Sequence, residues 1–167
     1  KSMKADVSYY IPSRLNEGYG MSVDVIKKLS EDGIKLIITV DNGISSIDEI
    51  DYANKLGIDT VVTDHHLPKD ELPNAVAVVD PHRPDSQLEF RDFAGVGVAF
   101  ALALAVSGSS PAVMLSGYSD LLALGTVADV MPLVHENRNF VWYGLRKINH
   151  NCSKGLKALL GAAGAKF

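Results

Sequence analysis

The chain has 167 residues, of which 47% are hydrophobic and 22% are charged, and its formal net charge is −4. This balance excludes a disordered or fibrous chain and indicates a soluble globular protein with enough apolar material for one core. The negative charge argues against a protein that binds nucleic acid mainly through a positive surface, although carboxylates around divalent cations would lower the formal charge without repelling a phosphate.

The first half of the chain alternates strands and helices. The expected strands are short runs of apolar, mostly β-branched residues, and glycines close the helices between them. The strands are predicted at residues 7–11, 35–40, 60–63 and 75–79, and the helices at residues 22–30 and 46–56. Because the strands are hydrophobic without alternation, they indicate a mainly parallel sheet with helices on both faces.

The second half of the chain, from Phe93 onward, has a helical pattern throughout. The helices are predicted at residues 95–106, 119–128, 137–149 and 154–163. The fold class is therefore α/β, with a parallel sheet followed by a helical C-terminal part. Open parallel sheets bind their ligands at the carboxyl ends of the strands, so the chemistry is expected there.

The sequence favours the cytoplasm as the compartment. The longest apolar stretch, residues 93–106, is too short and too rich in Ala and Gly for a membrane span. No secretory leader opens the chain. Cys152 is the single cysteine, so no internal disulfide can form, and a reducing compartment is indicated.

The first polar cluster, Asp41-Asn42-Gly43, directly follows the expected strand at residues 35–40. An Asp at the end of a buried strand, with Asn-Gly turning the chain sharply behind it, would point a carboxylate into the crevice above the sheet. The alternative is an Asp that only begins a turn or caps the next helix.

The second cluster, Asp64-His65-His66, follows the expected strand at residues 60–63. Neighbouring side chains that leave a strand point to opposite sides, so one histidine can bind a metal while the other faces the substrate. Two histidines and an Asp at a strand end are difficult to explain by packing alone.

The third cluster contains Asp129, which precedes Pro132 and therefore lies at a helix end or in the turn after it. A carboxylate gains nothing from the helix dipole at that position, which favours a functional charge, and a solvated turn residue is the alternative. The three clusters offer carboxylate oxygens and imidazole nitrogens, which suit Mn²⁺ or Mg²⁺. Thiolate ligands are absent, which argues against structural zinc.

In order and spacing, the three clusters resemble the motifs of the DHH phosphoesterase superfamily. Four further segments are similar to the RecJ-like single-stranded-DNA exonucleases of that superfamily. They are Tyr-Ile-Pro-Ser-Arg at residues 10–14, Glu-Gly-Tyr-Gly at 17–20, Ala-Gly-Val-Gly-Val at 94–98 and Glu-Asn-Arg at 136–138. The resemblance covers nearly the whole chain.

The resemblance implies a metal-dependent 5′-to-3′ exonuclease that hydrolyses phosphodiester bonds of single-stranded DNA in repair and recombination. It implies two Mn²⁺ or Mg²⁺ ions, with Asp41 bridging them and with His65 and Asp129 binding one of the two. It implies catalytic roles for Asp64, which would orient the site from outside the metal shell, and for His66, which would face the scissile phosphate.

Arg14 would contact substrate phosphate by the same resemblance, and a surface ion pair is the alternative for this residue. A single-strand-binding protein or a helicase would be protein partners, and no membrane is involved. Two other functions stay open. The first is a small-molecule phosphohydrolase or short-oligonucleotide nuclease of the same superfamily, and the second is a catalytically inactive DHH-like binding module.

The family pattern also predicts that residues 1–167 form a partial DHH catalytic domain. An Asp-x-Asp-Gly motif is expected upstream of Lys1, and a DHH-associated domain is expected after Phe167. Because the upstream aspartates would complete the metal pair, we expect this chain alone to be inactive and to bind Mn²⁺ weakly.

Overall fold

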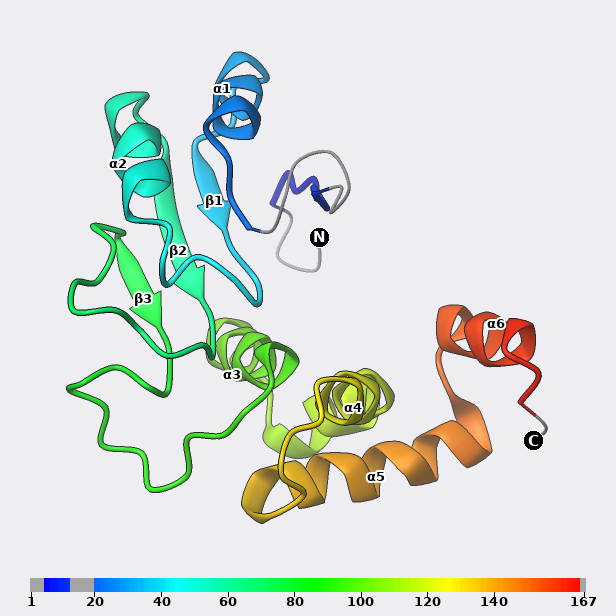
Figure 1. The fold of residues 1–167 in the computed structure, drawn as a ribbon. Helices are drawn as coiled ribbons and strands as arrows, with labels where there is room; N and C mark the ends of the chain where they lie inside the picture. The colour runs from blue at the N-terminus through cyan, green and yellow to red at the C-terminus, as the bar shows by residue number, and fades with distance from the viewer. Residues whose placement is uncertain (1–4, 13–19, 166–167) are drawn as a thin grey trace. The chain divides into compact units, whose positions relative to one another are not determined.

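The computed structural model describes residues 5–12 and 20–165, and the chain divides after Pro84 into two units. The first, which we call the sheet unit, contains α1 (Val23–Glu31), β1 (Leu36–Ile38), α2 (Ile47–Lys55), β2 (Asp59–Thr63) and β3 (Ala77–Val79). The second, the helical unit, contains α3 (Gly95–Ser107), α4 (Pro111–Ala128), α5 (His135–Asn151) and α6 (Lys154–Ala162) (Figure 1).

The three strands form a parallel sheet in the order β1-β2-β3. This confirms the α/β fold class, with a parallel sheet and a helical second part. Residues 5–12, where a first strand was expected, have no regular structure, and Tyr9 and Ile11 are exposed. Apolar, β-branched composition produces a strand only where a neighbouring strand completes its backbone hydrogen bonds.

The core of the sheet unit lies between the sheet and the pair α1 and α2. Ile26, Ala53 and Ile58 are its buried centre, and Ile37 of β1 packs against them. Both helices end near glycines with positive φ, Gly33 and Gly57, as the sequence indicated. Burying a side chain of the size of Ile26 contributes roughly 1.5–3 kcal/mol to stability, so this small cluster fixes the helices on the sheet.

The carboxyl ends of β1 and β2 lie at one edge of the sheet because the strands are parallel. The Thr63 hydroxyl donates to the Thr39 carbonyl oxygen at 2.6 Å, and the Asp41 amide donates to the Thr63 carbonyl oxygen at 3.0 Å. Gly43 turns the chain here with φ 110°, and a Cβ at this position would lie 2.8 Å from the Thr39 hydroxyl. The loop after β1 is thus fixed against the end of β2.

In the helical unit, α4 and α5 pack closely at Gly144, where a side chain would collide with the Ser119 carbonyl group. Asp120 is fully buried; it accepts a hydrogen bond from the Ser153 amide at 2.7 Å and pairs with the Lys147 ammonium group at 3.1 Å. One carboxylate therefore ties α4 to α5 and to the start of α6.

Helix α4 begins eight residues earlier than the sequence prediction, at Pro111 instead of Ser119. Ser110 caps it, because its hydroxyl accepts from the Val113 amide at 3.4 Å, and proline suits the first helical position. Gly117 obscured the pattern, since an interior glycine lowers helix propensity without preventing a helix in tertiary context.

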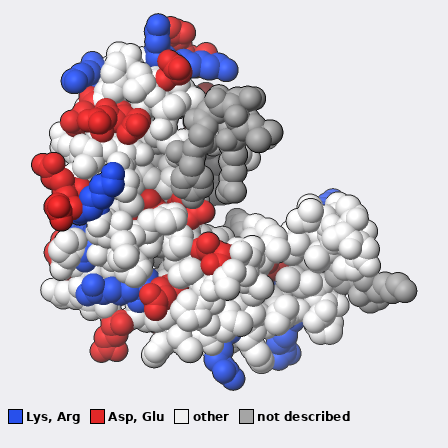
Figure 2. Space-filling view, in the orientation of Figure 1, with Lys and Arg blue, Asp and Glu red and all other residues white. Residues whose placement is uncertain are grey.

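Helices α1 and α4 differ in charge. Helix α1 carries Asp24, Lys27, Lys28 and Glu31, whereas the one charged residue of α4 is the buried Asp120. Figure 2 shows side chains of both charges over α1 and α2 and a largely uncharged surface over α4. Even so, no helix in the described part of the chain combines the length and the apolar character that crossing a membrane requires.

Candidate metal centre

Asp41 follows β1 and has a left-handed backbone conformation, with φ 64°. Aspartate tolerates this conformation better than most residues. The backbone on both sides is fixed, because the Asp41 amide donates to Thr63 and the Asn42 side chain donates to the Val40 carbonyl oxygen at 2.9 Å. The turn expected after this strand therefore forms, and it presents a half-exposed carboxylate at the edge of the sheet.

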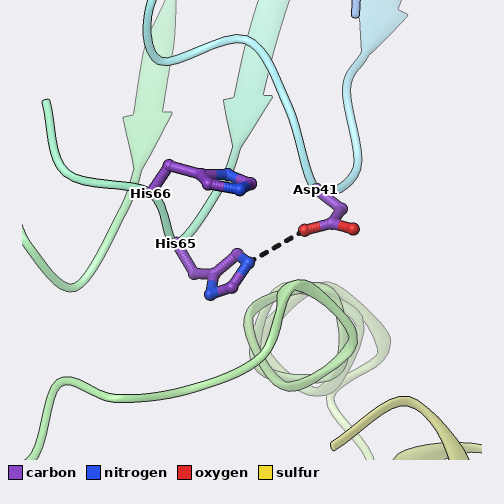
Figure 3. Close-up of side chains that lie close together, drawn as sticks. All are labelled: Asp41, His65 and His66. Carbon is purple, nitrogen blue, oxygen red and sulfur yellow. Dashed lines mark ion pairs between the residues drawn. The ribbon is translucent and has the colours of Figure 1, made fainter. Parts of the chain in front are cut away.

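His65 meets this carboxylate. Its Nε2 atom lies 3.0 Å from Oδ1 of Asp41, and its side chain is only 9% exposed (Figure 3). The two residues come from different strands and are brought together by the parallel pairing of β1 with β2. Their contact was expected from the motif positions and is present.

The rings of His65 and His66 lie side by side, with centroids 4.5 Å apart and planes inclined by 54°. The expectation that they point to opposite sides was wrong. Strand alternation does not extend to them, because β2 ends at Thr63 and the chain bends at His66. His66 is the more exposed of the two, and its Nδ1 atom lies 2.7 Å from Oδ1 of Asp64.

Asp64 is buried and connects both loops. Its Oδ2 atom accepts from the Ile44 amide at 3.0 Å, and its Oδ1 atom accepts from the amides of His65 and His66 at 2.8 and 3.3 Å. Burial by itself raises the pKa of Asp64, but the hydrogen bonds from Ile44, from the His66 ring and from the two amides outweigh burial and lower that pKa below its ordinary value. Asp64 is therefore an ionised acceptor that orders the loop after β1 and orients His66.

The donor set fits a hard or borderline divalent cation. Asp41, His65 and His66 each offer one ligand atom, and these atoms lie within 4.8 Å of one another. Adjacent ligands of an octahedral ion, each about 2.1 Å from it, lie about 3 Å apart, which agrees with the 3.0 Å between Asp41 and His65. Carboxylate and imidazole ligands suit Mn²⁺, and carboxylates suit Mg²⁺. From the sequence, His66 was expected to face the substrate and not to bind the metal; in the structure its ring lies within reach of the ligand group.

Asp129 lies in the helical unit, where it is the C-cap of α4 and is exposed. The position at a helix end agrees with the sequence prediction. That Asp129 binds the same metal as Asp41 and His65 stays a prediction, and so do the roles assigned to all the site residues. Arg14 lies outside the described residues.

Asp80 is a buried carboxylate that the sequence argument did not assign. It follows β3 directly, and its Oδ1 atom accepts from the His82 amide at 2.7 Å. Burial raises the pKa of Asp80, and the nearby charge of Asp64 raises this pKa further. Together they outweigh the hydrogen bond from His82, which lowers it. The available signal was its place directly after the strand predicted at residues 75–79.

Comparison with known proteins identifies the relatives of this chain. A family model described as the DHH family, N-terminal domain, matches residues 1–126. The single-stranded-DNA-specific exonuclease RecJ of Bacillus subtilis (strain 168) is 43% identical over 164 residues, which cover 98% of this chain and 20% of that protein. RecJ of Escherichia coli (strain K12) is 42% identical over 171 residues, which cover 95% of this chain and 30% of the relative.

Two solved structures have a similar fold. A crystal structure of exonuclease RecJ bound to manganese matches with a TM-score of 0.83 and 36% identity, covering 98% of this chain and 41% of that one. A crystal structure of RecJ from Thermus thermophilus in complex with Mn²⁺ matches with a TM-score of 0.70 and 35% identity. The match covers 87% of this chain and 22% of that one. The chain thus spans between about a fifth and two fifths of the relatives it matches.

Proposed function

The chain belongs to the DHH family, and we propose that it is part of the catalytic core of a metal-dependent exonuclease that hydrolyses phosphodiester bonds of single-stranded DNA. The contact of 3.0 Å between Asp41 and His65 carries the proposal, because it joins two metal-ligand types from two motif loops. Similarity to RecJ proteins over nearly the whole chain supports single-stranded DNA as the substrate. Digestion from 5′ to 3′, in repair and recombination, belongs to the proposal through the family resemblance.

In this proposal Asp41, His65 and Asp129 are metal ligands, with Asp41 shared between two ions. When bound, Mn²⁺, the ion named for two similar structures, or Mg²⁺ would activate water for attack and offset negative charge on the attacking and leaving oxygens. The carboxylate of Asp41 supplies negative charge and a second oxygen for sharing. The nearly buried imidazole of His65 supplies a neutral nitrogen whose position is fixed by the end of β2.

Asp64 and His66 act as a pair. Asp64 accepts from Nδ1 of His66, which directs the other ring nitrogen, Nε2, away from Asp64. In this proposal the His66 ring faces the scissile phosphate. The lowered pKa of Asp64 keeps its negative charge, so Asp64 remains an acceptor that holds the His66 ring in place to stabilise the scissile phosphate or the leaving oxygen.

Arg14 is proposed to bind a substrate phosphate, because a guanidinium group can donate two parallel hydrogen bonds to phosphate oxygens. A single-strand-binding protein or a helicase is the proposed protein partner, and the cytoplasm is the proposed location. These assignments rest on the family resemblance.

The test of the proposed function uses the full-length protein with His65→Ala. Mn²⁺ affinity is measured by calorimetry, and turnover is measured on single-stranded DNA at saturating concentration. We expect turnover to fall at least a thousandfold, because removal of a ligand disrupts both hydroxide formation and charge neutralisation. His82→Ala is the control, since His82 also follows a strand but lies outside the metal group. Normal metal-dependent turnover in His65→Ala would refute the proposal.

Arg14→Ala separates substrate binding from metal binding in the same protein. Loss of one phosphate contact should weaken DNA binding and reduce the slope of log affinity against log salt by about one unit, with Mn²⁺ affinity unchanged. If the variant binds DNA normally at every salt concentration, Arg14 has no substrate role and the surface ion pair is the better interpretation.

A further inference from the structure

The loop after α4 has a strained backbone that its own side chains do not explain. The Met131 amide donates to the Thr126 carbonyl oxygen and the Val130 amide to that of Val127, both at 3.1 Å. These two bonds form a Schellman motif behind the C-cap residue Asp129. The left-handed position of this motif usually holds glycine, but here it holds Val130, with φ 56° and 87% exposure.

A β-branched residue adopts this conformation only when its surroundings impose it. The exposed side chain of Val130 gains no burial in return. The constraint must therefore come from contacts of the backbone around it.

Asn137 supplies such a contact. It is fully buried in the first turn of α5, and its side-chain amide donates to the carbonyl oxygen of Pro132 at 3.1 Å and to that of Asp92 at 2.7 Å. Two carbonyl acceptors fix the orientation of the amide, because only its NH₂ group can donate. Asn137 thereby joins the first turn of α5, the segment before α3 and the loop that begins at Asp129.

We propose that Asn137 is a positioning residue for Asp129. By fixing Pro132, three residues beyond Asp129, it keeps the chain in the left-handed turn at Val130 and so sets the direction of the Asp129 carboxylate. A neutral amide suits this place better than a carboxylate, because the C-terminal end of α4 carries partial negative charge. The inference rests on the proposed function, in which Asp129 is a metal ligand.

The experiment compares three variants of the full-length protein. Asn137→Ala removes both hydrogen bonds. Val141→Ala is the matched control, because Val141 is also buried on α5, one turn further along, but contributes packing alone. Asp129→Asn is the reference for loss of the carboxylate itself.

The first measurement is hydrogen exchange of the backbone amides of residues 129–131 and 133–134 in the metal-free protein, since Pro132 has no N–H group. We expect exchange in Asn137→Ala to be at least tenfold faster than in the wild type and exchange in Val141→Ala to be unchanged. The second measurement is Mn²⁺ affinity by calorimetry. Asn137→Ala should weaken it about tenfold, as loss of a residue behind a metal ligand does, and Val141→Ala should not. Added to Asp129→Asn, Asn137→Ala should weaken Mn²⁺ binding no further.

Normal exchange or normal Mn²⁺ affinity in Asn137→Ala would overturn the positioning role. If Asn137→Ala does not fold, Asn137→Ser replaces it, since a serine side chain is too short to reach both carbonyl groups. If Asp129→Asn binds Mn²⁺ like the wild type, the proposed ligand set is wrong and the positioning role falls with it. Fast exchange in Asn137→Ala would in that case identify Asn137 as a structural residue only.

Discussion

Two loops of this protein carry a carboxylate predicted to bind metal, and they are fixed by opposite chemistry. The loop after β1, with Asp41 at φ 64°, is fixed by the buried carboxylate of Asp64, which accepts hydrogen bonds from backbone amides. The loop after α4, with Val130 at φ 56°, is fixed by the buried amide of Asn137, which donates to backbone carbonyl groups.

The difference follows from the elements that the loops leave. The turns beyond β1 and β2 expose amides that need an acceptor, and a charged acceptor binds them strongly. The loop beyond a helix C-terminus exposes carbonyl groups in a region of negative potential, where a neutral donor is favoured over a carboxylate. The identity of the supporting residue is thus dictated by the backbone groups left without partners.

Asp64→Asn should cause the largest loss of stability, because it replaces a charged acceptor by an amide whose nitrogen cannot accept a hydrogen bond. We expect a loss of about 3 kcal/mol in unfolding free energy, since several hydrogen bonds to a charged group are lost and buried amides are left unsatisfied. Urea unfolding measures it. The control is Asp59→Asn, on the exposed start of β2. Equal midpoints for the two variants would show that the buried charge does not fix the loop.

Gly43→Ala tests the tightness of the first loop. The added Cβ would lie 2.8 Å from the Thr39 hydroxyl and 3.3 Å from Val62, at a φ of 110° that alanine disfavours. We expect a loss of about 2 kcal/mol, measured by the same unfolding experiment. Gly20→Ala is the control, since it has positive φ with open space around it. A loss no greater than that of Gly20→Ala would mean that strain alone, without the close approach, accounts for the cost.

Val130→Gly should increase stability, because glycine adopts the left-handed conformation at this position in the second loop without strain. We expect a gain of about 1 kcal/mol in unfolding free energy. Thermal unfolding, with Val127→Gly as a control inside α4, measures the gain. If Val130→Gly is as destabilising as Val127→Gly, the left-handed conformation at Val130 is not a source of strain.

The smallest expected effect is the pH dependence of Asp64 and Asp80. The folded-state pKa of Asp64 is lowered, so its contribution to stability is present above the unfolded value of 3.8 and is lost as the pH falls through the folded-state pKa. The folded-state pKa of Asp80 is raised, so the ionisation of Asp80 lowers stability as the pH rises through the unfolded and then the folded-state pKa. Asp80→Asn should therefore be slightly more stable than the wild type at neutral pH and lose this advantage in acid.

Unfolding measured between about pH 3 and 7 distinguishes the two carboxylates. The deficit of Asp64→Asn should shrink toward acid pH, whereas the gain of Asp80→Asn should disappear. Parallel pH profiles for the two variants would contradict the opposite directions of their pKa shifts.

The parallel α/β fold and the positions of the motif loops follow from the sequence. Runs of apolar, β-branched residues specify parallel strands, and the glycines at residues 33 and 57 end the two helices of the sheet unit through local backbone geometry. Parallel pairing then brings the ends of neighbouring strands to one edge, so the meeting of Asp41 with His65 was predictable.

The contacts that fix these loops depend on how the chain packs in three dimensions. Periodicity along a strand cannot show that β2 ends before His65, that the two histidine rings lie side by side, or that residues 5–12 have no regular structure. The roles of Asp64 and Asn137 depend on backbone groups 20 to 45 residues away in sequence. Those groups become donors and acceptors without partners only once the chain has folded, and the sequence does not record which of them are left.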